Sequence, residues 1–62
     1  MSNADETSHL IREYRINAAR MRAIANSTRS PETKAQFEQL ARELDHLADQ
    51  EAALAAGVRS RT

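Results

Sequence analysis

The sequence has no cysteine and no tryptophan, one glycine, one proline, and only two aromatic residues, Tyr14 and Phe37. Without cysteine the chain can form neither disulfides nor thiolate metal sites. A single glycine excludes a glycine-rich phosphate-binding loop. The longest apolar run, AALAAGV at 52–58, is far shorter than the roughly 20 residues that span a bilayer. Because no signal-like segment is visible either, we expect a cytoplasmic protein with no membrane partner.

The apolar content is too small for a sizeable core. Twelve large apolar side chains are present besides Met1, and burying one of them contributes roughly 1.5–3 kcal/mol. Ordering each residue costs on the order of 1.5 kcal/mol, so the balance for an isolated chain is unfavourable. Chains this small usually rely on disulfides, a metal or a partner subunit. We therefore expect a partner, either a second copy of the chain or an unidentified protein.

The charges sum to zero but are unevenly distributed along the chain. Residues 1–30 carry a net charge of +2, and residues 31–55 carry a net charge of −4. Opposite signs in the two halves favour packing of one segment against the other. They are less typical of a nucleic-acid-binding domain, which usually has an excess of positive charge.

A first helix is predicted over about residues 4–27. Its apolar positions recur at three- and four-residue spacing. They are Leu10, Ile11, Tyr14, Ala18, Met21, Ile24 and Ala25. A cap at Ser2 or Asn3 followed by Glu6 favours a helix start, and the short polar side chains of residues 26–28 favour a stop.

A turn is predicted over residues 28–30, directly before the next helix. The hydroxyl group of Ser30 can cap that helix. Pro31 suits the first helical position because its missing N–H would have no partner within the helix. Glu32 then lies favourably at the positive end of the helix dipole.

The second helix is predicted over about residues 31–56. Its apolar stripe has the same spacing as the first and comprises Phe37, Leu40, Leu44, Leu47 and Leu54. Gly57 is a natural terminator, with Val58 placed to fold back onto the last turn. Residues 57–62 are then a short basic tail.

Two helices joined by so short a turn must run antiparallel. The predicted fold is all-α: one helical-hairpin domain over residues 1–62. Alanines recur at a seven-residue interval in each helix, Ala18 with Ala25 and Ala41 with Ala48, and allow close approach as in a coiled coil. One side of each stripe stays open, so we expect two copies to close into a four-helix bundle. The predicted core and oligomer interface comprises Leu10, Ile11, Tyr14, Ala18, Met21, Ile24, Phe37, Leu40, Leu44, Leu47 and Leu54.

The pattern Glu-x-x-His occurs twice, at 6–9 and at 43–46. On helices of a bundle, this spacing supplies ligands to di-iron carboxylate sites. The ligands must project inward, however, and His46 lies nearly opposite the second apolar stripe. The bridging glutamates that such a site needs from the other helices are also missing. We predict no metal ion and no other cofactor.

Four arginines of the first helix form a candidate phosphate-contacting strip. They are Arg12, Arg15, Arg20 and Arg22. No aromatic residue lies among them for base stacking. The alternative is a solvated face that also attracts the acidic second helix of a neighbouring copy.

Two further residues depart from the pattern. Ile16 lies away from the first stripe, near Ala19 and Ala23, and is either a lone exposed side chain or part of a second contact face; we favour contact. Asn17 lies within the stripe. There it either fixes register and oligomeric state or reaches water from the edge of the stripe.

The segment YRINAARMRAIA, followed by SPETKAQFEQLARELDHLA, resembles short alphaproteobacterial helical-hairpin proteins of unknown function. The resemblance covers residues 14–48 and implies a helical hairpin without a known activity, substrate or cofactor. In architecture alone, the chain is also similar to the Rop-type RNA-binding hairpin dimers.

No nucleophile, base and acid are arranged for catalysis, so we predict that the protein is not an enzyme. The predicted function is a small interaction module that self-associates or docks as an accessory subunit on a larger protein. The alternative is a Rop-like hairpin dimer that binds RNA or another nucleic acid through the arginine strip.

Overall fold

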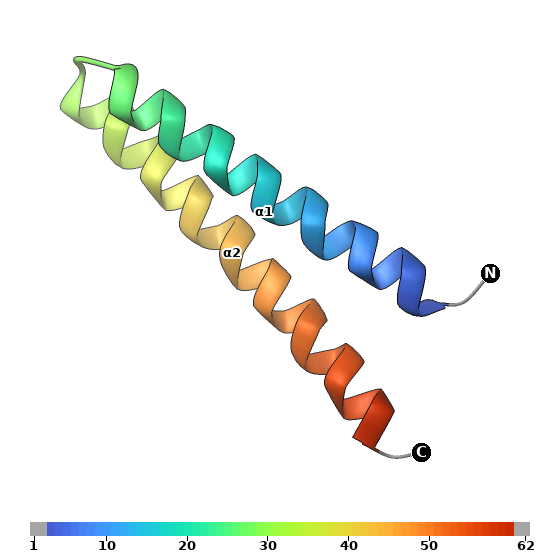
Figure 1. Cartoon of the computed structure of the whole chain (residues 1–62). Coiled ribbons are helices and arrows are strands. Elements are labelled where there is room, and N and C mark those ends of the chain that lie inside the picture. Colours follow the sequence, from blue (N-terminus) through green and yellow to red (C-terminus); the bar gives the residue numbers. More distant parts are fainter. Residues whose placement is uncertain (1–2, 61–62) are drawn as a thin grey trace.

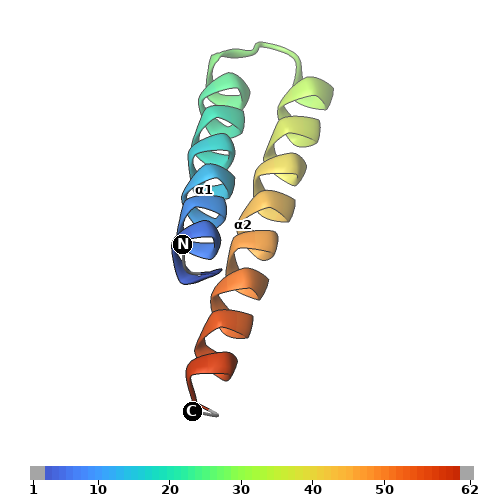
Figure 2. The ribbon, with the colours of Figure 1, turned by 90° about the vertical axis from the view of Figure 1, so that its right-hand side faces the viewer.

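The computed structural model describes residues 3–60 and, within them, the side chains of residues 6–57. It consists of two helices, α1 (Asn3–Ser27) and α2 (Pro31–Ser60), joined by residues 28–30. The two ribbons run antiparallel and side by side (Figures 1 and 2). Helices are the only regular elements of the described residues, so the predicted helical hairpin is confirmed.

The link between the helices is held by hydrogen bonds at both of its ends. At the end of α1, the Thr28 amide donates to the carbonyl oxygen of Ile24 at 3.1 Å. At the start of α2, the Thr33 amide donates to the Ser30 Oγ at 3.3 Å, which makes Ser30 the N-terminal cap. Pro31 occupies the first helical position. The predicted stop and start are therefore both confirmed.

The two helices meet through small side chains. Ala18 and Ala25 on α1, and Ala41 and Ala48 on α2, are at most 1% exposed. Each pair is spaced by seven residues, so the alanines recur along one face and allow the helix axes to approach closely. Larger side chains of the same faces are only half-buried, namely Ile11, Tyr14, Met21, Phe37 and Leu44. None of the large side chains described is completely buried.

The C-terminal end of α2 differs from the prediction. The helix continues through Gly57 to Ser60, beyond the predicted end at residue 56. Gly57 does not adopt a positive φ angle, so it does not form the left-handed cap that commonly ends a helix. A single glycine inside a helix costs only about 1 kcal/mol relative to alanine, and the helix accommodates it. The predicted fold-back of Val58 lies outside the side chains that are described.

The hairpin has a large surface for its mass. Its radius of gyration is 14.5 Å and its extents are 49 × 19 × 10 Å, whereas a compact domain of this length has a radius of about 11 Å. Its accessible surface is 4972 Å², against about 4,000 Å² expected for a folded monomer of this mass. The cause is visible in Figure 2, where the molecule is a single layer of two helices.

Candidate interaction surface

The hairpin has two edges, where residues beside the interhelical contact reach the surface. On α1, Arg15 and Arg22 each come directly after a half-buried residue in the sequence. On α2, Asp45 also comes directly after a half-buried residue. Both arginines form ion pairs with Asp45. Residues that directly follow half-buried positions therefore share one edge of the hairpin. In an antiparallel pair, the residues that directly precede the buried positions must then share the opposite edge.

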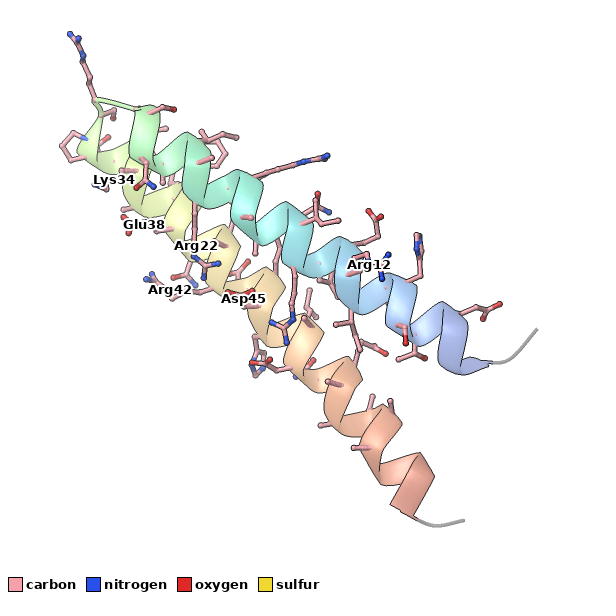
Figure 3. All side chains as sticks on the ribbon, in the orientation of Figure 1. Arg12, Arg22, Lys34, Glu38, Arg42 and Asp45 are labelled. Carbon is pink, nitrogen blue, oxygen red and sulfur yellow. The ribbon has the colours of Figure 1, made fainter. Side chains whose placement is uncertain are left out.

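The edge that carries the ion pairs is called the charged edge, and it consists of Arg15, Arg22, Asp45 and Asp49. Arg15 Nη2 lies 3.1 Å from Asp49 Oδ1, and Arg15 Nη1 lies 3.8 Å from Asp45 Oδ1. Arg22 Nη2 donates to Asp45 Oδ2, and Figure 3 shows these two side chains where the helices meet. The arginine side chains are about half exposed, so each pair contributes at most about 1 kcal/mol. The attraction predicted between the basic and acidic halves is thus confirmed, and it helps to set the register of the hairpin.

The opposite edge is apolar. Its members directly precede buried or half-buried positions and recur every seven residues on each helix. This apolar edge comprises Leu10, Asn17 and Ile24 on α1, and Leu40, Leu47 and Leu54 on α2. Its leucine and isoleucine residues are between 37% and 65% exposed. Five large apolar side chains along one edge of so small a molecule form a candidate contact surface.

The predicted interface is therefore divided into two sets. Ile11, Tyr14, Ala18, Met21, Phe37 and Leu44 are buried or half-buried between the helices. Leu10, Ile24, Leu40, Leu47 and Leu54 are exposed in the single hairpin, so only their part in an oligomer interface stays open, as a prediction. The reason is geometric, because one neighbouring helix covers only a narrow stripe of another. The wider stripe of this sequence extends past that contact on one side.

The four arginines of α1 do not form one strip. Arg15 and Arg22 lie on the charged edge, where aspartates bind them. Successive residues of a helix are rotated by about 100°, so Arg20 points roughly 140° away from Arg15. Arg12 lies between these two directions, about 60° from Arg15 on the same side as Arg20. Two of the four arginines in the candidate strip thus face the acidic residues of α2, and contact of the strip with phosphates stays a prediction.

The two Glu-x-x-His motifs are not brought together. His46 and Glu43 are exposed and contact neighbours on their own helix: the Nε2 atoms of His46 and Gln50 are 3.1 Å apart, and Gln39 donates to Glu43 at 3.3 Å. His9, on α1, is also exposed. Among the described residues, no three histidine, cysteine, aspartate or glutamate side chains are grouped so that they could hold a metal ion.

Ile16 belongs to neither edge. It is 40% exposed, as is Leu47, and Ala19 and Ala23 near it are also exposed. This outer face of α1 is less apolar than the apolar edge, because Ile16 is its only large apolar residue among the described side chains. Asn17, by contrast, lies on the apolar edge itself and is half-buried.

The aspartates of the charged edge were absent from the predicted interface. Asp45 and Asp49 read as solvated positions because aspartate is polar. The signal that could have found them is the register: when the chain folds back at residues 28–30, they come level with the arginines of α1. Ala41 and Ala48 were predicted only to allow close approach, yet they are among the most buried side chains described.

Comparisons with protein-family models, with curated proteins and with solved structures find no match for this chain. Neither of the two described helices is long and apolar enough to cross a membrane. The function is therefore inferred from the geometry of the hairpin.

Proposed function

We propose that the protein is a small non-enzymatic interaction module, in which two hairpins pack together through their apolar edges to form a four-helix bundle. The observation that carries this proposal is the asymmetry of the two edges. One edge is closed by ion pairs between the helices, and the other exposes five leucine and isoleucine side chains. A hairpin with this asymmetry has one surface suited to an apolar partner.

The surface area supports a partner of this size. The hairpin exposes about 1,000 Å² more than a compact monomer of equal mass. A protein in an interface of ordinary size buries about 800 Å². The surface area that a second hairpin would bury on the apolar edge is therefore about as large as the excess surface area of the single hairpin.

Covering the apolar edge gains a free energy of the same order as the cost of association. Completing the burial of side chains that are about 40% exposed contributes roughly 0.6–1.2 kcal/mol for each. Ten such side chains in a dimer give on the order of 6–12 kcal/mol, which is comparable with the 4–15 kcal/mol cost of association.

Nucleic-acid binding is less favoured by the arrangement of charge. Binding of phosphates through the α1 arginines requires free cationic side chains on one face. Arg15 and Arg22 are instead bound by Asp45 and Asp49. The same apolar edge could alternatively dock on a larger protein, in which case the isolated chain would stay monomeric.

Sedimentation equilibrium at micromolar concentrations tests the proposal with two matched variants. Leu47→Glu places a charge at the centre of the apolar edge, where burial of an unpaired carboxylate is costly. Ile16→Glu makes the same change at a side chain of equal exposure on another face. We expect Leu47→Glu to weaken the dimer at least tenfold and Ile16→Glu to leave it unchanged. A wild-type chain that is a stable, cooperative monomer would show the proposal to be wrong.

A further inference from the structure

The apolar edge is symmetric about its own centre. Arg15 and Asp49 are level with each other, because their side chains form an ion pair across the two helices. Asn17 and Leu47 each lie two residues closer to the turn, so they are level as well. The remaining members of the edge lie seven residues before and seven residues after these two positions. The three levels of the edge are therefore Leu10 with Leu54, Asn17 with Leu47, and Ile24 with Leu40.

Two hairpins can place these edges face to face in two ways. If the two-fold axis runs across the hairpin at the level of Asn17 and Leu47, each helix packs on its own copy and the turns lie at opposite ends. Asn17 then faces Asn17 of the partner copy. If the axis runs parallel to the helices, α1 packs on α2 of the partner copy, and the turns lie at the same end. Asn17 then faces Leu47 of the partner copy.

The amide group of Asn17 distinguishes the two arrangements. A carboxamide both donates and accepts hydrogen bonds, so two of them facing each other can satisfy one another. An amide buried against leucine is left without a partner. The second arrangement has two such amides, which disfavours it by a factor on the order of 30 or more. An asparagine at a single contact position is also known to fix register and oligomeric state in coiled coils.

The charges beside the apolar edge fit both arrangements equally well. Glu13 and Arg20 border the edge on α1, and Glu43 borders it on α2. With the axis across the hairpin, Arg20 comes level with Glu13 of the partner copy. With the axis along the helices, Arg20 comes level with Glu43 instead. An arginine meets a glutamate in either case, so the amide decides.

We infer that the dimer has its two-fold axis across the hairpin, with paired Asn17 side chains at its centre and the two turns at opposite ends. This inference rests on the proposed self-association. Asn17 is the residue that determines orientation, and the five leucine and isoleucine residues supply the affinity. Leu10 then faces Ile24 of the partner copy, and Leu40 faces Leu54 of the partner copy.

Disulfide trapping tests the orientation, since the chain has no cysteine of its own. Three single-cysteine variants, Leu10→Cys, Ile24→Cys and Leu54→Cys, each keep Asn17 in place. They are mixed in pairs, oxidised, and analysed by non-reducing electrophoresis and mass spectrometry. We expect the mixture of Leu10→Cys with Ile24→Cys to give at least tenfold more mixed disulfide than that of Leu10→Cys with Leu54→Cys. The reverse preference overturns the inferred axis.

A fourth variant separates the role of the amide from that of the surface. With Asn17→Leu in both chains, neither arrangement leaves an amide unpaired. We expect the preference between the two cysteine mixtures to fall at least tenfold while the dimer becomes tighter. An unchanged preference shows that Asn17 does not set the orientation. A dimer that cross-links in the reverse pattern leaves the proposed function intact and refutes only the axis, whereas a monomer in sedimentation refutes both.

Discussion

Replacing Ala18 by leucine tests the close approach of the two helices. Ala18 is 0% exposed and faces α2, so the added side chain has no space without moving the helices apart. Ala19 is the next residue on the same helix and is exposed, which makes Ala19→Leu the matched control. Leucine and alanine both favour helix, so the control changes the free energy of unfolding by only a few tenths of a kcal/mol.

The magnitude follows from the geometry of the contact. Adding atoms to a filled contact typically costs about 1–3 kcal/mol. In a domain of this size, each kcal/mol shifts the melting temperature by roughly 4–8 °C. We therefore expect Ala18→Leu to lower the melting temperature by on the order of 10 °C, and Ala19→Leu to change it little.

Thermal unfolding followed by circular dichroism at one fixed protein concentration measures this difference. The concentration must be equal because the melting temperature of a self-associating protein depends on it. If Ala18→Leu and Ala19→Leu unfold at the same temperature, α1 does not contact α2 through Ala18, and the reasoning from the alanine contacts is refuted.

Three other changes have expected outcomes. Asp45→Asn removes the carboxylate that Arg15 and Arg22 share, and we expect denaturant titration to show a loss of at most about 2 kcal/mol for the two ion pairs, which disappears at high salt; a larger loss unaffected by salt contradicts a surface role. Ser30→Ala removes the cap of α2 and should cost about 1 kcal/mol in the same titration, whereas no loss means that the cap is unimportant. Gly57→Ala should stabilise the chain by about 0.5–1 kcal/mol, because nothing lies within 4 Å of the added methyl group and φ is not positive; destabilisation contradicts the continuous α2.

The sequence predicted the start of a helix well where the stabilising interactions are between residues close together in the chain. The cap at Ser30 and the proline at position 31 need only neighbouring backbone groups, and both lie where expected. The end of α2 was missed for a related reason. Gly57 permits a helix to end, but it does not compel it to end, and the helix continues to Ser60.

The apolar stripes were visible in the sequence, but their division was not. Periodicity shows that Leu47 and Ala48 lie on the same broad face of α2, yet one is 40% exposed and the other 0% exposed. Which of the two faces α1 depends on how far each helix is rotated about its own axis. That rotation is decided by contacts between helices, including the ion pairs of Arg15 and Arg22 with Asp45.

The sequence by itself determined the two helices, the turn between them and the antiparallel hairpin, because periodicity, capping and a short link act between residues close in the chain. Only the tertiary structure decided that alanines fill the contact, that the arginines of α1 bind the aspartates of α2 on one edge, and that Leu10, Ile24, Leu40, Leu47 and Leu54 are left exposed along the other. These features depend on the rotation and register of one helix against the other, and each is the sum of many contacts between residues far apart in the chain.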